Sequence, residues 1–450
     1  LYMSNKDSLI DIVSSKQILS YAFGGWEPPW GIAFIVDSAN VYLILLVSFI
    51  SVIATIYAHT MLAREIAVED LPKAYAVWLL TIASLFGLSM TGDAFNLYVL
   101  FEICALSSYS LLASGGKKTY LATFYYLLIG SIGACFYLIG VAYLFIKTGS
   151  LNMAHLFELI PPIYFTKSIL IGFIFINLGL FIKMALFPVH SWLPNIYSKA
   201  PISTTCLLAP LGTKLTIYIL IRFYFDVFTP EFVFQVLNIK NVMVWISTIA
   251  IIVGSMYAIF HTNYRKIITF IVVAEIGYIV GGVWTGHPDS LTGAIYHILA
   301  DSLMTLSLFM IGGMILFYIK SEKMSDCSNI FKQLPFTAVA LIVVFASIVG
   351  IPPTSGFFSK MYLIKGAFQM GYFQFIVALL FSSLASLFIF FRLFESYFYN
   401  KSDDVGIVRI KESRLFVIPL LSISTGIIVL GITFNYWFHY IQNIIPVGLR

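Results

Sequence analysis

Charged side chains are scarce in this 450-residue chain, because aspartate, glutamate, lysine and arginine together make up only 10% of it. Hydrophobic residues account for 60%, and the mean hydropathy is strongly positive. A soluble globular domain has about 25% charged residues, so this composition excludes one. We expect an all-α polytopic membrane protein that is embedded in lipid and has no sizeable soluble domain.

Cysteines are also few, and their spacing is uninformative. The four cysteines are Cys104, Cys135, Cys206 and Cys327, and no two of them form a Cys-x-x-Cys motif. This spacing argues against a disulfide framework, an iron–sulfur cluster or a zinc site. We therefore expect no cofactor, no metal, no catalytic residues and no redox chemistry in this chain, although a larger oxidoreductase could contain it. The net charge of +5 comes from loop residues without a basic domain, so no nucleic-acid partner is expected.

Long apolar stretches dominate the chain, and roughly twelve are long enough to cross a bilayer, which needs about 20 residues. They lie at about 33–57, 74–91, 95–114, 121–146, 168–199, 203–225, 242–260, 267–284, 292–319, 335–370, 374–399 and 415–440. Two of them, 168–199 and 335–370, are too long for one straight helix and contain prolines in their interior. These prolines are Pro188 and Pro194 in the first and Pro352 and Pro353 in the second. We expect both stretches to be broken helices.

Lysine and arginine gather in alternate loops. One set of loops contains Arg64, Lys73, Lys117, Lys118, Lys199, Arg265, Lys266, Lys320, Lys323, Lys332, Arg392, Lys401, Arg409, Lys411 and Arg414. The other set has little beyond Lys147, Lys167 and Lys240. The rich side is expected to be cytoplasmic, which places both termini outside the cytoplasmic membrane of a prokaryotic cell.

Five ionisable residues fall inside the apolar stretches: Glu102, Lys183, Lys214, Glu275 and Lys360. A charge at the centre of a membrane helix costs about 2.5–3.5 kcal/mol on insertion scales. Such residues usually serve a function, so these five are the first candidates for a functional site.

The two broken stretches run in opposite directions, and each contains a lysine. Glu102 lies two stretches before Lys183, and Glu275 lies two stretches before Lys360, which is the pattern of an inverted repeat of five helices. The expected parts are an external segment at 1–32, a peripheral helix and loop at 33–73, two repeats at 74–225 and 242–399, and a peripheral helix at 415–440.

A carboxylate beside a lysine in a medium of low dielectric stabilises both charges, whereas separating the two favours the neutral amine. A lysine in such a pair can therefore carry a proton. The broken helices free backbone carbonyls that need water or polar side chains, so they also admit water. Titratable groups joined by water form a proton path.

Several motifs resemble a known family. They are Phe101-Glu102, Phe181-Ile-Lys183-x-x-Leu-Phe-Pro188-x-His190-x-Trp-Leu-Pro194, Ala200-Pro201, Lys214-Leu, Arg222-Phe and Gly350-Ile-Pro-Pro-x-x-Gly-Phe-x-x-Lys360. In this order they resemble the antiporter-like subunits of complex I, membrane-bound hydrogenases and Mrp-type cation/proton antiporters. The entry motif Gly24-Gly-Trp-x-x-Pro-x-Gly-Ile32 and the double proline are most similar to the Mrp D-type subunit and its relatives in archaeal hydrogenase and sulfur-reductase complexes.

The resemblance implies a fold of fourteen helices, so we expect that about two amino-terminal helices are absent from this chain. It also implies roles for four residues. Glu102 and Lys183 would form the charge-coupled pair, Lys214 would be the bridging lysine, and Lys360 would exchange protons with the far side.

The chain departs from the family where many members have an Asn-His pair and a lysine, because it has Ala300, Asp301 and Thr305 there. One relay lysine is thus missing. We expect His297, Asp301 and water to bridge the gap between Lys214 and Lys360, with Glu275 as an additional carboxylate.

Each candidate also has a purely structural interpretation. Lys183 and Lys360 would cap freed carbonyl groups, and Lys214 would pair with an acid of a neighbouring helix. Glu275 and Asp301 would be hydrogen-bonded structural acids. His190 and His297 would serve in packing. Asp37 and Asp93 lie near span ends, where capping is expected. Arg222, Arg392 and Glu395 look interfacial and receive no chemical role.

Two functions remain open. The chain is either a subunit that translocates protons, with or without exchange for sodium, or a non-conducting spacer in the same kind of complex. An organic-solute carrier is a weaker third hypothesis, because no motif indicates a substrate pocket. The expected partners are other membrane subunits of a large complex, lipid, protons and, in an antiporter, sodium.

Overall fold

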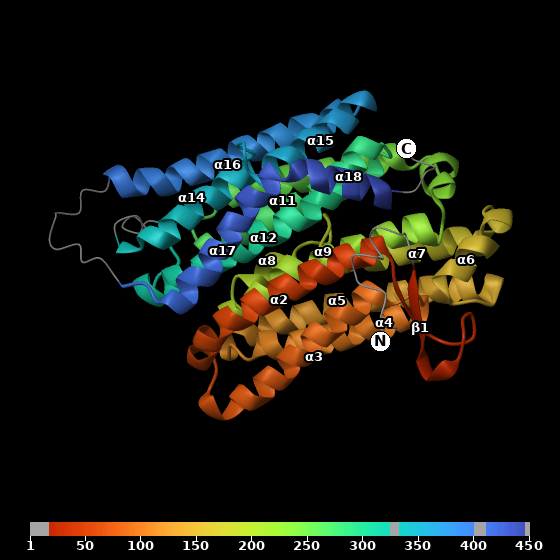
Figure 1. The fold of residues 1–450 in the computed structure, drawn as a ribbon, viewed down its shortest axis with the longest axis horizontal. Coiled ribbons are helices and arrows are strands. Elements are labelled where there is room, and N and C mark those ends of the chain that lie inside the picture. The colour runs from red at the N-terminus through yellow and green to blue at the C-terminus, as the bar shows by residue number, and fades with distance from the viewer. Residues whose placement is uncertain (1–17, 325–332, 400–410, 446–450) are drawn as a thin grey trace.

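The computed structural model of the chain is a bundle of long helices with a small β-hairpin at one end (Figure 1). It describes residues 18–324, 333–399 and 411–445. Residues 1–17 of the predicted external segment, together with Cys327, Lys332, Lys401 and Arg409, lie outside these ranges. The other three cysteines are free thiols.

The elements of the first half are β1 (Leu19–Ala22), η1 (Phe23–Gly25), β2 (Ala33–Val36), α2 (Ser38–Glu65), η2 (Val68–Asp70), α3 (Leu71–Met90), α4 (Ala94–Ala113), α5 (Lys117–Thr148), α6 (Met153–Leu159), η3 (Pro161–Ile163), α7 (Lys167–Lys183), α8 (Trp192–Tyr197) and α9 (Ile202–Asp226). Those of the second half are η4 (Phe232–Val236), α10 (Lys240–Phe260), α11 (Tyr264–Trp284), α12 (Pro288–Ile319), α14 (Pro335–Val349), α15 (Ser355–Gln369), α16 (Phe373–Tyr399), α17 (Arg414–Ile432) and α18 (Phe434–Ile444).

Within the described residues, ten helices are long and apolar enough to cross a membrane, so the protein is a multi-pass membrane protein. Both stretches that were expected to break do so. The helix α7 ends at Lys183 and α8 begins at Trp192, while α14 ends at Val349 and α15 begins at Ser355.

Two predicted spans are wrong at one end. Residues 33–36 form the strand β2, which pairs with β1 in antiparallel orientation, with Val36 opposite Leu19. The helix α2 therefore begins only after Asp37. The Asp37 carboxylate accepts a hydrogen bond from the Asn40 backbone N–H at 2.9 Å, and this cap fixes the helix start. The predicted helix at 415–440 is divided at Thr433 into α17 and α18.

The helix α18 differs in character from the spans. It buries Phe434 and Ile441 but leaves Tyr436 81% exposed, and its sequence mixes aromatic and polar residues. Such a helix suits the boundary between lipid and water better than the hydrocarbon core, which explains why the chain turns at Thr433.

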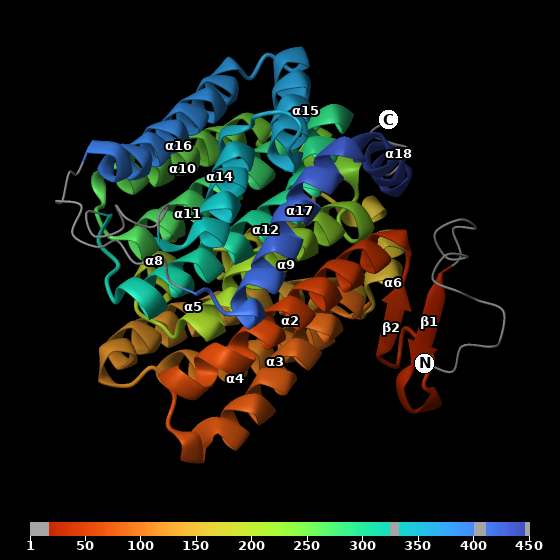
Figure 2. The same ribbon diagram turned by 60° about the vertical axis from the view of Figure 1, so that its left-hand side comes forward.

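Three helices, α9, α11 and α12, form the centre of the bundle (Figure 2). In their most apolar 18-residue stretches, 94%, 94% and 78% of the residues are buried, against 39% in α3 and α5. Lys214, Glu275 and Asp301 lie on these central helices. Their charges are therefore enclosed by protein and do not face lipid.

Charged caps hold the beginning of α9 in place. The Glu65 carboxylate at the end of α2 accepts hydrogen bonds from the backbone N–H groups of Ile202 at 2.6 Å and Ser203 at 3.1 Å. An anion is favourable at a helix amino terminus. The Arg265 guanidinium donates to the backbone carbonyl oxygens of Tyr197, at 2.9 Å, and Ala200. These contacts tie α2, α8, α9 and α11 together at one end.

Glycines allow α5 and α7 to approach closely. A Cβ atom added to Gly179 would lie 2.6 Å from the backbone carbonyl oxygen of Gly133. Neither helix can move away without losing contacts with the rest of the bundle.

We expect Gly179→Ala to lower the unfolding free energy of the protein by about 1–3 kcal/mol, because the added methyl group overpacks this crossing. The matched control is Gly426→Ala in α17, where the nearest atom would be 3.9 Å away. Thermal unfolding of the purified protein in detergent measures both. Equal stability of the two variants would contradict the close approach of α5 and α7.

Candidate functional site

The first ionisable pair joins α4 and α7 at the first helix break. Lys183 is the last residue of α7, and its Nζ lies 3.7 Å from Oε1 of Glu102 in the middle of α4. The side chains are 11% and 29% exposed, respectively, and Nζ is also 5.6 Å from the centre of the Phe101 ring. The pair is longer than a hydrogen-bonded salt bridge, so no hydrogen bond has to break when the two charges separate.

The break itself does not depend on Lys183 for capping. The Trp192 indole N–H donates to the carbonyl oxygen of Ile182 at 3.0 Å and so satisfies a carbonyl close to the break. Lys183 is therefore available for Glu102. Pro188 lies in the turn between the two helices, and Pro194 lies in the first turn of α8.

A cavity of about 40 Å³ lies between Lys183 and α9. Its polar lining includes Ser108, Tyr126, Thr213 and Thr216. The Thr213 hydroxyl is buried and has no hydrogen-bond partner in the described part of the chain. A polar cavity of this size holds water, since one water needs about 10–15 Å³ of such volume. The cavity thus brings Lys183 and the polar side chains of Thr213 and Thr216 on α9 to one space, and Lys214 follows Thr213 in the chain.

The second centre is a buried pair between α9 and α12. Lys214 Nζ lies 2.9 Å from Asp301 Oδ2, and the two side chains are only 1% and 2% exposed. Thr305 closes a ring, because its hydroxyl accepts from Lys214 Nζ at 3.3 Å and donates to Asp301 Oδ1 at 2.9 Å. The threonine that replaces the expected lysine is thus a partner of both charges.

The third centre joins α11, α12 and α15. His297 Nε2 lies 2.5 Å from Glu275 Oε2, and His297 Nδ1 lies 2.8 Å from the Ser359 hydroxyl. The Ser359 hydroxyl also lies 3.0 Å from the carbonyl oxygen of Gly356. Both ring nitrogens of His297 therefore have a polar partner, and which of them donates follows from the tautomer of the ring. The pair places an imidazole and a carboxylate within hydrogen-bond distance in the protein interior, an arrangement through which a proton can pass.

Lys360 lies at the second break. Its Nζ donates to the Ser383 hydroxyl at 2.9 Å and to the carbonyl oxygen of Ile348, which the end of α14 leaves free. The Tyr278 ring separates Lys360 from the third centre, with its centroid 4.9 Å from Nζ and 5.4 Å from the centre of the His297 ring. The capping role considered for Lys360 is thus present in the structure. Lys360 has no carboxylate within ion-pair distance among the described residues.

The remaining expected site residues lie at the edges of this arrangement. His190 lies in the turn after α7, with its ring 5.5 Å from that of Phe187, and forms no ion pair within the described ranges. Pro352 and Pro353 lie between α14 and α15. Asp93 caps α4 by accepting from the Phe95 and Asn96 backbone N–H groups, as expected of a residue at a span end.

One charged cluster was not expected from the sequence. Arg222 Nη1 lies 2.5 Å from Asp37 Oδ2, and Arg222 Nε lies 2.6 Å from Asp226 Oδ2. The spacing of four residues between Arg222 and Asp226 on one helix was the available signal. Nothing local to the sequence indicated that Asp37, at the start of α2, would complete the cluster.

The buried pair yields a prediction about stability. Asp301→Asn should lower the unfolding free energy by about 3–5 kcal/mol, because it leaves the Lys214 ammonium buried without a counter-charge. The double variant Lys214→Met with Asp301→Asn should recover most of that loss, since no unpaired charge remains. Thermal unfolding of the purified protein in detergent separates the two outcomes. If the double variant is as unstable as the single one, the charge pair is not the cause.

Comparison with known proteins gives consistent matches. Residues 91–434 match the family model described as "NADH:quinone oxidoreductase/Mrp antiporter, TM". The chain is 37% identical over 441 residues to the NADH-quinone oxidoreductase subunit N of Desulforudis audaxviator, a match that covers 95% of this chain and 87% of that protein. It is 29% identical to the D-type Na(+)/H(+) antiporter subunit of Bacillus subtilis, over 88% of this chain and 79% of that protein.

Solved structures show the same fold. A chain of the Mrp complex from Dietzia sp. superimposes with a TM-score of 0.86 at 23% identity, over 96% of this chain and 88% of that one. A chain of the membrane-bound sulfane sulfur reductase, an archaeal respiratory membrane complex, has a TM-score of 0.86 at 25% identity, with 96% and 87% covered.

Proposed function

Because the chain belongs to the NADH:quinone oxidoreductase/Mrp antiporter family of membrane subunits, we propose that it translocates protons along its buried ionisable side chains. The observation that carries this proposal is the series formed by the three polar centres, from Glu102 to His297, and by Lys360 beyond them. They occupy the interior of the bundle, where uncompensated charges would be costly.

Each centre contributes one part of the route. Separation of Glu102 from Lys183 favours release of a proton from the amine into the adjoining cavity. Lys214 and Asp301 take up the charge, and the Glu275–His297 pair, one helical turn further along α12, holds the next proton. Lys360 exchanges protons with the far side of the membrane. Asp301 and His297 together replace the missing relay lysine.

The proposal extends to the arrangement in the membrane. The two broken helices, each of which follows an acid-bearing helix by two spans, support two inverted units at 74–225 and 242–399. The gathering of lysine and arginine in one set of loops supports a cytoplasmic position for that side and an outside position for both termini.

The setting is a multi-subunit membrane complex. Relatives carry the names of a quinone oxidoreductase subunit and a sodium/proton antiporter subunit, so the chain functions with other membrane subunits in one of these assemblies. In an antiporter the exchanged ion would be sodium. The driving reaction belongs to the partners.

A non-conducting spacer is the second candidate. The closed ring of Lys214, Asp301 and Thr305 favours it, because a fully satisfied ion pair can also be a static cross-link between helices.

Neutralising the first pair separates the two functions. In vesicles containing the complete complex, Lys183→Met or Glu102→Gln should slow proton-coupled transport at least about a hundredfold, the scale of a lost proton-transfer group. Lys118→Met is the control, because Lys118 is exposed at the start of α5. Normal transport by correctly assembled Lys183 and Glu102 variants would contradict translocation through this chain and favour the spacer.

A further inference from the structure

A line of polar residues starts at Lys214 and follows α9 to its end. Lys214, Tyr218, Arg222 and Asp226 are spaced by four residues, so each lies next to the following one on the helix surface. Together they span about 18 Å of helix, which exceeds half of the hydrocarbon thickness of about 30 Å. The line therefore reaches from the buried pair to one end of the bundle.

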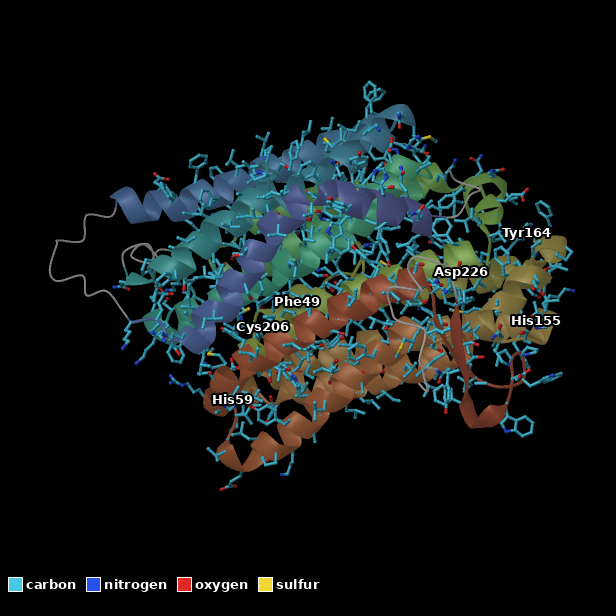
Figure 3. All side chains as sticks on the ribbon, in the orientation of Figure 1. Phe49, His59, His155, Tyr164, Cys206 and Asp226 are labelled. Carbon is cyan, nitrogen blue, oxygen red and sulfur yellow. The ribbon has the colours of Figure 1, made fainter. Side chains whose placement is uncertain are left out.

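The end of this line is a partly exposed ion cluster. Arg222, Asp37 and Asp226 have side chains that are 21%, 24% and 37% exposed. Asp226 lies toward the same end of the bundle as His155 and Tyr164, opposite His59 (Figure 3). It is thus at the end remote from the loops rich in lysine and arginine.

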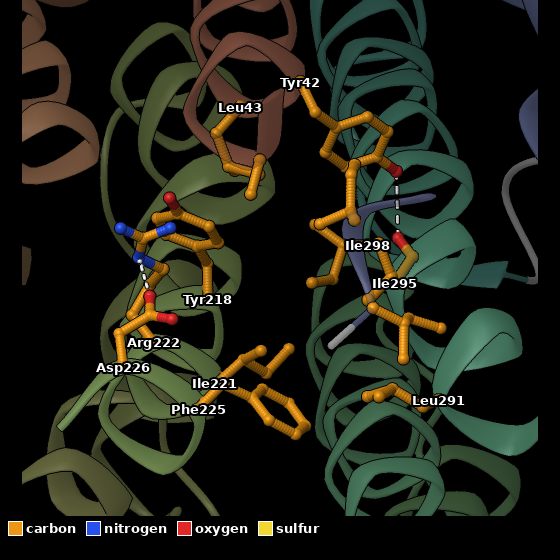
Figure 4. A pocket seen from close by; sticks show the side chains of 13 residues that line it. Tyr42, Leu43, Tyr218, Ile221, Arg222, Phe225, Asp226, Leu291, Ile295 and Ile298 are labelled. Carbon is orange, nitrogen blue, oxygen red and sulfur yellow. Dashed lines mark hydrogen bonds and ion pairs between the residues drawn. The ribbon is translucent and has the colours of Figure 1, made fainter. Parts of the chain in front are cut away.

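A cavity of about 60 Å³ lies beside the line. Arg222, Asp226 and Tyr218 from α9 line one side, and Leu291, Ile295 and Ile298 from α12 line the other (Figure 4). A cavity of this size has room for several water molecules. It extends from the ion cluster inward to the level of Tyr218.

The residue that indicates water in this cavity is Tyr218. Its side chain is only 5% exposed, and its hydroxyl has no hydrogen-bond partner in the described part of the chain. A buried hydroxyl left unsatisfied costs about 1–3 kcal/mol, so a cavity water is its natural partner. One helical turn separates Tyr218 from Lys214, and a similar step separates Ile298 from Asp301.

We infer that α9 carries a second, branching proton route, which runs from the Lys214–Asp301 pair through the Tyr218 hydroxyl and the water-filled cavity to the Arg222 cluster. This inference rests on the proposed function. In the transfer step, the Lys214 ammonium gives one proton to a water between Lys214 and Tyr218, and this water passes a proton to the Tyr218 oxygen while the hydroxyl gives its own proton to a cavity water. The lysine is left neutral, the bridging water and the tyrosine are unchanged, and the cavity water becomes a hydronium ion that releases its proton at the end of the cavity formed by Arg222 and Asp226.

The route explains why a charged cluster and an unsatisfied hydroxyl lie on the same helix as the central lysine. It also gives the middle of the molecule its own connection to the face opposite the lysine-rich loops. Protons at Lys214 then need not pass through the Glu275–His297 pair and Lys360 to leave the membrane.

Tyr218→Phe tests the route, because it removes the hydroxyl and keeps the ring. In vesicles containing the complete complex, we expect proton-coupled transport to fall about tenfold, which is less than the loss expected for the first pair because the route through the Glu275–His297 pair and Lys360 stays open. The matched control is Tyr57→Phe on α2, whose hydroxyl is bonded to the Met310 carbonyl oxygen at 3.1 Å and lies away from the cavity. Transport at the normal rate in the Tyr218 variant, with transport by the parent complex intact, would overturn the role of Tyr218.

The water in the cavity is measured separately on the unmodified complex. Hydroxyl-radical footprinting with mass spectrometry should modify Tyr218 severalfold faster than Tyr57, because radicals form in water next to the ring. Equal, slow modification of the two tyrosines would overturn the route whether or not the complex translocates protons. If the parent complex shows no proton-coupled transport, the proposed function and the proton route both fail, while fast modification of Tyr218 would still establish the water-filled cavity.

Discussion

Hydrocarbon offers no hydrogen bonds, so every ionisable group inside this bundle must find its partner within the protein. That constraint organises the central helices. Lys214 on α9 pairs with Asp301 on α12, His297 on α12 pairs with Glu275 on α11, and Lys360 binds the free carbonyl end of α14. Each contact joins two different helices, so the polar groups also fix the positions of these helices relative to one another.

The partners differ in how tightly they are held, and this difference has chemical consequences. The Glu102–Lys183 pair is long and partly exposed, whereas the Lys214–Asp301 pair is short and almost fully buried. Separating a long, partly hydrated pair breaks no hydrogen bond, whereas a short buried pair resists separation unless water or another group replaces the lost partner. The cavities next to Lys183 and Tyr218 lie where such replacement is needed.

The helix α12 contributes residues to both the second and the third polar centre. His297, Asp301 and Thr305 are spaced by four residues, so they lie on one strip of this helix. His297 contacts Glu275 and Ser359, and Asp301 and Thr305 both contact Lys214. A lysine at 305 would add a second cation beside Lys214. Threonine instead contributes one donor and one acceptor, which leaves a single lysine and a single carboxylate in the ring. The charge of this centre is thereby balanced without a second buried cation.

The sequence by itself determined the membrane class, the family and the residues of the buried axis, because charges in apolar stretches are costly and therefore conspicuous. Both helix breaks were also predictable, since each stretch was too long for one straight helix and contained two prolines in its interior. The start of α2 and the turn at Thr433 were missed, because a strand pairing and an interfacial helix depend on contacts with distant segments.

Only the tertiary structure determines which charged side chains pair with one another. Asp301 binds Lys214 and Glu275 binds His297, although both acids were expected only to lie near the gap left by the missing lysine. Likewise, only the folded chain brings Asp37 to Arg222 and places a cavity beside Tyr218. Spacing along one helix can be read from a sequence, but the partner across a helix interface depends on how the helices pack and rotate against one another.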